Sequence, residues 1–277
     1  MPPDLTVESH RFDALGTRCE LFAIGQTRQC LLDCEGWVRE LGARLTRFSP
    51  DSELSRLNTA GGQWVDVSPE TAAILRESLR AFEMSDGLVN VAVLPSMLAI
   101  GYTRSFAQGA TDAQLDGVAP APPVTEVLEV KDCRARLGSG AGIDLGGIAK
   151  GWMADRLAVM LGSNAVANLG GDLRAVGDGP RGDGWPVGVG TRTLMLRDQG
   201  AATSSVRRRR WGGLHHLIDP RSGTPAFTGL EESSVVAPNA ADAETVAKTA
   251  LLLGPGLAQA YCAKHALAWW LDGPHDS

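Results

Sequence analysis

The stretch 143–151 constrains this chain most, because two adjacent glycines there separate an apolar segment from the start of a helix. We expect a buried strand that ends at Gly146 and Gly147, and a helix over 148–161 with Lys150 in its first turns. Glycines let a backbone approach a ligand closely, while helix amides and a lysine ammonium favour an anion. The segment suits a phosphate or pyrophosphate, although its spacing matches neither a P-loop nor a dinucleotide fingerprint. A tight strand-to-helix turn with a surface lysine is the alternative.

The rest of the chain alternates between helical and strand-like spacing. The first 25 residues read as a strand pair broken at Gly16, and 105–125 reads as a loop. Predicted helices cover 27–43, 52–58, 240–253 and 255–265, another begins at Ser68, and predicted strands cover 126–130, 134–138, 164–177, 186–198, 201–210, 214–218, 233–237 and 267–271. These elements indicate an α+β fold with mixed sheets and flanking helices. A length of 277 residues suits a single domain over 1–277 or two interleaved lobes.

Composition argues against several classes of protein. The formal net charge is −6, which disfavours a nucleic-acid partner or a membrane-surface protein. The N-terminus lacks a signal-peptide pattern, and no apolar run is long enough to span a bilayer. The five cysteines show no zinc spacing, so we expect a cytoplasmic protein with reduced thiols.

Two other segments carry chemistry. In Asn168-Leu169-Gly170-Gly171-Asp172 a second glycine pair allows close packing of strands or of a flat ring. In the segment 216–225, His216 could deprotonate or orient a nucleophile, and the alternative is a half-buried histidine beside a β-turn. The run Arg207-Arg208-Arg209-Arg210-Trp211 reads as a solvated hairpin strand with one or two arginines at a ligand's phosphates or ribose.

In combination these segments resemble the ApbE family of flavin transferases over roughly residues 10 to 255. The resemblance rests on Leu15-Gly16-Thr17, the run 47–58, Ser85-Asp86-Gly87, the run Asp144-Leu145-Gly146-Gly147-Ile148-Ala149-Lys150-Gly151, the run 168–172, and the His-x-x-Asp-Pro-x-x-Gly run that begins at His216. It implies an ApbE-like fold related to the T-fold. It also implies an enzyme that cuts FAD and attaches FMN, through its phosphate, to a Thr or Ser of a target protein, with release of AMP. Family members use magnesium for this reaction.

The resemblance also implies roles for individual residues. The flavin site would include Ser52, Glu53, Asn58 and Asp86; the pyrophosphate site would include Gly146, Gly147, Ala149 and Lys150; and the reacting hydroxyl would lie near His216, Asp219, Thr203 and Ser204. The magnesium ligands would be the main chain of the loop at Ala149 and an acidic side chain at Glu244.

One departure from the family pattern bears on the mechanism. Where family members carry an Asp and, four residues later, a Thr as metal ligands, this chain has Glu244 and Lys248. Lysine has no acceptor atom, so either its ammonium takes over part of the metal's charge or the two residues form an ordinary i,i+4 helix pair. Three functions follow: a transferase with Lys248 as a catalytic cation, a protein that binds FAD without reacting it, or an FAD pyrophosphatase.

Overall fold

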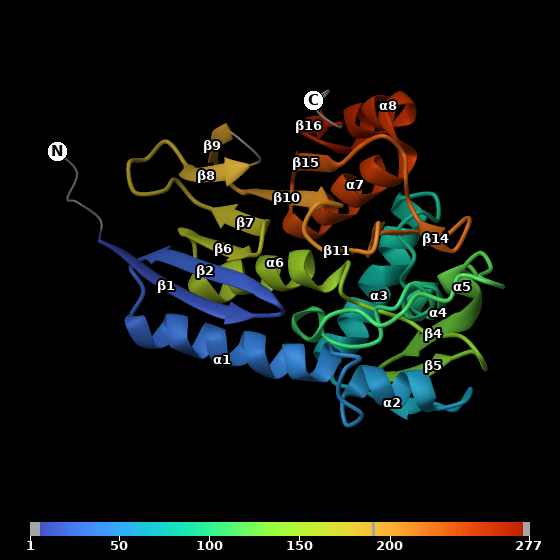
Figure 1. Ribbon diagram of the computed structural model, residues 1–277. Helices are drawn as coiled ribbons and strands as arrows, with labels where there is room; N and C mark the ends of the chain where they lie inside the picture. The colour runs from blue at the N-terminus through green and yellow to red at the C-terminus, as the bar shows by residue number, and fades with distance from the viewer. Residues whose placement is uncertain (1–5, 190–191, 274–277) are drawn as a thin grey trace.

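A seven-stranded antiparallel sheet forms the centre of the molecule. The computed structural model describes residues 6–189 and 192–273, and Figure 1 shows the arrangement of their helices and strands. In spatial order the strands are β1 (Val7–Ala14), β2 (Thr17–Ile24), β6 (Ala165–Leu169), β7 (Asp172–Val176), β10 (Gln199–Ser205), β15 (Glu232–Ala237) and β16 (Ala268–Asp272). Neighbouring strands pair antiparallel throughout this sheet. The predicted α+β class is therefore confirmed.

Helices and a hairpin cover the two faces of this sheet. Helices α6 (Ala149–Leu161) and α7 (Ala240–Leu253) pack against its central strands, α1 (Arg28–Leu45) packs against β1 and α6, and α8 (Pro255–His265) packs against α7. A separate apolar cluster joins β8 (Trp185–Val189) and β9 (Arg192–Leu196) to β6, β7, β10 and β15. Burial on both faces explains why the central strands are rich in Ala, Val and Leu.

Helices α6 and α7 cross closely and cap each other. A β-carbon on Gly151 would lie 2.6 Å from the Ala240 carbonyl oxygen, so only glycine permits this crossing. Asp155 of α6 accepts hydrogen bonds from the first two amides of α7, at 2.9 and 3.0 Å. In return, Glu244 of α7 accepts from the Gly151 amide in the first turn of α6, at 2.8 Å. Each carboxylate thus satisfies amides that a helix start leaves unpaired.

A smaller sheet and several short elements complete the fold. The small sheet has the order β3 (Val65–Asp66), β5 (Arg134–Leu137), β4 (Leu128–Lys131), and it packs with α2 (Glu53–Thr59), α3 (Pro69–Met84) and α5 (Val124–Val127). The remaining elements are η1 (Val91–Val93), α4 (Leu94–Ala99), η2 (Phe106–Gln108), and the short strand pairs β11 (Arg210–Trp211) with β12 (Leu214–His215) and β13 (Ile218–Asp219) with β14 (Thr224–Pro225). None of the helices described here is long and apolar enough to cross a membrane.

Five strand predictions are corrected by the structure. The strand expected over 214–218 is two short strands, β12 and β13, and His216 and Leu217 between them belong to neither. The segment before Gly146 is irregular rather than a strand, because the Asn58 side chain takes both backbone groups of Ile143 that a neighbouring strand would need. The predicted strand 164–177 is two strands joined at Gly170 and Gly171. The predicted strand 186–198 is likewise β8 and β9, with positions 190–191 outside the described residues. The strand expected over 201–210 ends at Ser205, so 207–209 do not alternate as strand residues.

Candidate active site

A cavity of about 1000 Å³ lies where the sheet, two helices and several loops meet. Its walls come from the β1–β2 turn, the end of α1, the loop 144–147, the β6–β7 turn, β10 and the segment that follows it, and α7. Nine of the residues predicted from the sequence line it: Gly146, Gly147, Ala149, Lys150, Thr203, Ser204, His216, Glu244 and Lys248. Segments more than 200 residues apart, from Ala14 to Leu252, therefore meet at one site.

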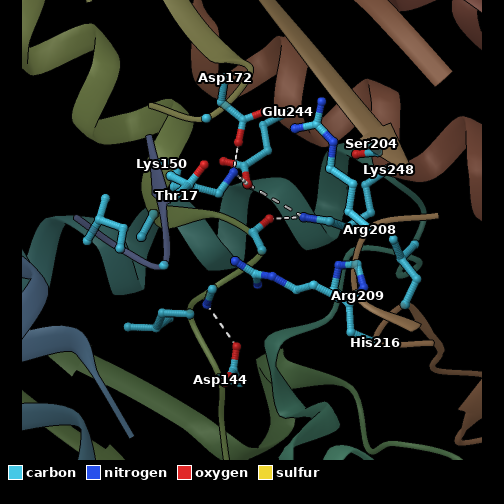
Figure 2. A pocket seen from close by; sticks show the side chains of 18 of the residues that line it. Thr17, Asp144, Lys150, Asp172, Ser204, Arg208, Arg209, His216, Glu244 and Lys248 are labelled. Atoms are coloured by element: carbon cyan, nitrogen blue, oxygen red, sulfur yellow. Dashed lines mark hydrogen bonds and ion pairs between the residues drawn. The ribbon is translucent and has the colours of Figure 1, made fainter. Parts of the chain in front are cut away.

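A buried cluster of two lysines and two carboxylates forms the floor of the cavity. Glu244 is only 3% exposed, and its Oε1 lies 3.6 Å from Lys150 Nζ and 3.8 Å from Lys248 Nζ. Lys150 also forms an ion pair with Asp172, and Lys248 donates a hydrogen bond to the Gly147 carbonyl. Figure 2 shows the two lysines converging on Glu244. The cluster joins the loop 144–147, α6, α7 and the start of β7.

Burial and mutual charge set the protonation of this cluster. Burial alone would raise the pKa of Glu244, but the ammonium groups of Lys150 and Lys248 hold it below its usual value. Burial lowers the pKa of both lysines, and Glu244 opposes that shift. Glu244 is therefore the group that most strongly opposes the loss of charge on both lysines.

The cavity is positively charged, although the whole protein is acidic. Among the described residues that line it, six are basic and four are acidic, which leaves an excess of two positive charges. Arg208 and Arg209 belong to this set, and Arg209 lies near His216 in Figure 2. Arg209 also contributes to lowering the pKa of His216, Lys150 and Lys248. Of the run 207–210, Arg208 and Arg209 thus line the cavity, and their contact with a ligand stays a prediction.

Aromatic rings form another part of the wall. Phe48 and Tyr102 line the cavity with ring centroids 5.8 Å apart, and Phe106 lies nearby. The Arg47 guanidinium stacks on Phe48 and Tyr102, at 4.3 and 4.7 Å from the ring centroids. A buried ion pair of 2.7 Å with Asp144 fixes Arg47. This wall offers apolar rings and a delocalised cation, both of which favour a flat aromatic ligand.

His216 is a partly buried histidine with an unused ring nitrogen. Its Nδ1 finds no hydrogen-bond partner within the described part of the chain. Burial, Arg209 and Lys248 lower the pKa of His216 to about 3. The imidazole is therefore neutral at physiological pH and able to accept a proton.

Comparison with known proteins identifies the family. A sequence profile of the ApbE family matches residues 15–270. The chain belongs to the ApbE family. It is 25% identical over 265 residues to the FAD:protein FMN transferase of Haemophilus influenzae, which covers 86% of this chain and 77% of that one. It is 27% identical to the Salmonella typhimurium enzyme of the same name, over 93% of this chain and 79% of that one.

Solved ApbE structures share the fold. The apo flavinyl transferase ApbE of Pseudomonas stutzeri superposes with a TM-score of 0.85 at 18% identity, over 98% of this chain and 94% of that chain. The flavin transferase ApbE of Vibrio cholerae gives a TM-score of 0.78 at 21% identity, over 98% and 95%.

Five residues predicted from the ApbE pattern do not line the cavity. Ser52 caps the N-terminus of α2, and Glu53 accepts hydrogen bonds from the amide and hydroxyl of Ser68. Asn58 holds Ile143 in place. Asp86 lies in the turn after α3 with a φ of 50°, and Asp219 ends β13 and accepts hydrogen bonds from Arg221. These five side chains therefore serve helix ends, turns and the backbone at Ile143.

Several ApbE cavity residues were not singled out from the sequence. They are Arg47, Phe48, Tyr102, Asp144 and Asp172. Asp144 and Asp172 each stand close to a glycine pair, a signal that could have identified them. Tyr102 lies in no motif, and nothing local distinguishes it.

Of the two predicted magnesium ligands, the Glu244 carboxylate is already engaged by other groups of the protein. Magnesium requires several oxygen ligands in near-octahedral geometry. Glu244 Oε2 accepts from the Gly151 amide, while Oε1 faces two ammonium groups and Lys248 bonds the Gly147 carbonyl. No group of three or more His, Cys, Asp or Glu side chains is placed to hold a metal in the described ranges. With Glu244 engaged and an ammonium at Lys248 in place of a second side-chain oxygen, the residues present do not fit a magnesium ion.

Proposed function

We propose that this chain is an FAD:protein FMN transferase. A Thr or Ser hydroxyl of an acceptor protein attacks the phosphorus on the FMN side of the FAD pyrophosphate, and the bond to AMP breaks. The products are a phosphodiester that joins FMN to the acceptor, free AMP and one proton. The observation that carries this proposal is the positive cavity beside an aromatic wall, in a chain that belongs to the ApbE family.

Each part of the reaction has chemical support in the cavity. Lys150, Arg208 and Arg209 supply cations for the pyrophosphate, and the first amides of α6 favour an anion. The rings of Phe48 and Tyr102 suit a flat ring of FAD.

In the proposed mechanism His216 takes the proton of the acceptor hydroxyl. Its side chain lines the cavity, and burial together with two nearby cations gives it a low pKa. A bound pyrophosphate would offset these cations and so reverse their part of the shift, which favours proton uptake by His216. Asp219, through its bonds to Arg221, acts as a positioning residue of the neighbouring loop.

The partners proposed are FAD and an acceptor protein with a reactive Thr or Ser. Action in the cytoplasm, without nucleic-acid or membrane partners, stays a prediction from the sequence. No step of the proposed reaction depends on magnesium, because the residues at the implied site do not fit that ion.

Covalent flavin on protein is the decisive product. The purified chain is incubated with FAD and an extract of its source organism, and proteins are separated in a denaturing gel. We expect a fluorescent band that carries FMN on Thr or Ser by mass spectrometry, together with released AMP. His216→Gln should abolish the band, whereas the matched change His265→Gln, at the end of α8, should preserve it.

Two results would exclude the transferase. AMP release without a fluorescent protein would identify an FAD pyrophosphatase, with water in place of the hydroxyl. FAD binding with neither product would identify a protein that holds FAD without reacting it.

A further inference from the structure

We infer that Lys248, together with Arg208 and Arg209, replaces the divalent cation, so that this chain binds and cleaves the FAD pyrophosphate without magnesium. This inference rests on the proposed function and specifies how its site neutralises phosphate. It concerns residues that line the cavity itself.

The position of the Lys248 ammonium supports this inference first. Nζ donates to the main-chain carbonyl of Gly147 and lies 3.8 Å from Glu244 Oε1. A carbonyl and a carboxylate oxygen are the donors that a hard divalent cation would use. A β-carbon on Gly147 would lie 2.6 Å from Nζ, so the glycine is what admits the ammonium so close to the loop. The lysine thus occupies the place between these two oxygens.

Burial shows that Lys248 and Glu244 do not form an ordinary exposed i,i+4 ion pair. Exposed i,i+4 pairs contribute about 0.3–0.5 kcal/mol to stability and are screened by salt. Here the Glu244 side chain is 3% exposed and the Lys248 side chain 17%, and Lys248 also bonds a loop 101 residues earlier in the chain. Buried charge destabilises the folded chain unless it has a partner of opposite charge. Lys248 also lines the cavity, so a bound anion could serve as a further partner.

The total charge of the cavity supports the same conclusion. The six basic and four acidic lining residues among those described leave two positive charges in excess. Arg39 of this set is paired with Glu35, which does not line the cavity, whereas Arg208 and Arg209 remain available for a pyrophosphate diester with roughly one negative charge on each phosphate. An added divalent cation would bring two further positive charges to a site that already holds its cations. It would also approach the ammonium groups of Lys150 and Lys248, which repel it.

The cleavage step uses the same groups. As the bond to AMP breaks, negative charge grows on the departing phosphate oxygen. Arginine binds phosphate oxygens in a bidentate manner, and lysine acts as a point charge. Arg208, Arg209 and Lys248 supply these two kinds of contact without a metal.

Binding of FAD in the presence of EDTA or magnesium tests the inference directly. Titration of the intact chain, followed by tryptophan fluorescence, gives Kd in each buffer. For the wild type we expect the two Kd values to agree within about twofold, because the cations are built into the chain. Lys248→Met should weaken FAD binding in EDTA by about tenfold or more, the loss expected for one charge-assisted contact.

Two probes separate a phosphate contact from a general structural effect. ADP carries the pyrophosphate without a flavin, and riboflavin carries the flavin without phosphate. Lys248→Met should weaken ADP binding and leave riboflavin binding within about twofold of wild type. Lys264→Met, in the last turn of α8, is the matched control and should change neither.

Two substitutions should make FAD binding depend on magnesium. Lys248→Thr with Glu244→Asp replaces the ammonium by oxygen ligands and removes its repulsion. This double variant should bind FAD weakly in EDTA and at least about tenfold more tightly with magnesium. Such a gain would support the inference, since it shows that Lys248 holds the position of the ion.

Several outcomes would overturn the inference. Wild-type binding of FAD that requires magnesium would refute it and leave the transferase function intact. Equal losses of ADP and riboflavin affinity in Lys248→Met would assign the lysine a structural role only. An absence of FAD binding in both buffers would refute the inference and the proposed function together.

Discussion

Replacing Glu244 by glutamine tests the electrostatic account of the cavity floor. The change keeps the shape of the side chain and an acceptor for the Gly151 amide, but removes the charge between two ammonium groups. Removing one partner of a buried ion pair typically costs about 3–5 kcal/mol of stability. The structure predicts a loss at the upper end of this range, because Glu244 serves both Lys150 and Lys248.

The loss of stability in Glu244→Gln is limited, because one of the two lysines can release its proton. A lysine in the variant can become neutral, and deprotonating a group with an ordinary pKa of about 10.4 costs about 4.6 kcal/mol at pH 7 and about 1.9 kcal/mol at pH 9. The folded variant then binds fewer protons than its unfolded state, so its stability rises with pH. We therefore expect Glu244→Gln to lose about 4 kcal/mol at pH 7 and about 2 kcal/mol at pH 9.

Urea unfolding at both pH values measures these losses. Glu244→Gln combined with Lys248→Met serves as the control, because it removes one ammonium along with the carboxylate. The double variant should be more stable than Glu244→Gln alone at pH 7, by about 2 kcal/mol. A loss for Glu244→Gln below about 1 kcal/mol, or one that stays constant between pH 7 and 9, would refute the reasoning.

Two further predictions concern a buried amide and the histidine. Asn58→Ala removes two hydrogen bonds of 2.9 Å to the backbone of Ile143 and should cost about 2–4 kcal/mol in urea unfolding, while an unchanged midpoint would contradict this support role. The pKa of His216 lies at about 3 in the folded chain, below its ordinary value, so the unfolded chain takes up the proton first and wild-type stability falls as pH drops from about 6.5 to 3. Between pH 7 and pH 5 the free energy of unfolding of His216→Gln should fall by about 1–2 kcal/mol less than that of the wild type, whereas His265→Gln should behave like the wild type. The same pH dependence in His216→Gln and the wild type would contradict a neutral His216.

Local signals in the sequence predicted most of the helices and strands. Ser52 and Ser68 each precede a helix, and each side chain accepts a hydrogen bond from an amide of the first turn. Such caps depend on residues only three positions apart, so a sequence pattern reveals them. The irregular segment before Gly146 could not be predicted in this way, because its conformation depends on Asn58, which is 85 residues away in the chain.

The sequence predicted those site residues that belong to a motif. It did not predict residues whose role depends on a partner far away in the chain. The motifs identified Lys150, His216 and Glu244, which line the cavity. They also selected Asp219, which serves a loop, since a motif does not separate residues that touch a ligand from those that support the wall. Arg47 belongs to the run 47–58 but was given no role, because its buried partner lies 97 residues later.

The double role of Glu244 connects the helix crossing to the chemistry of the site. One carboxylate oxygen caps α6, while the other faces Lys150 and Lys248. The position of both lysines therefore depends on how closely α7 approaches α6, and Gly151 sets that approach. Because the helices cap each other reciprocally, a shift of one would unpair amides in both. The cations that we assign to the pyrophosphate are thus held by the same contacts that join the two helices, and no bound ion is needed to order them.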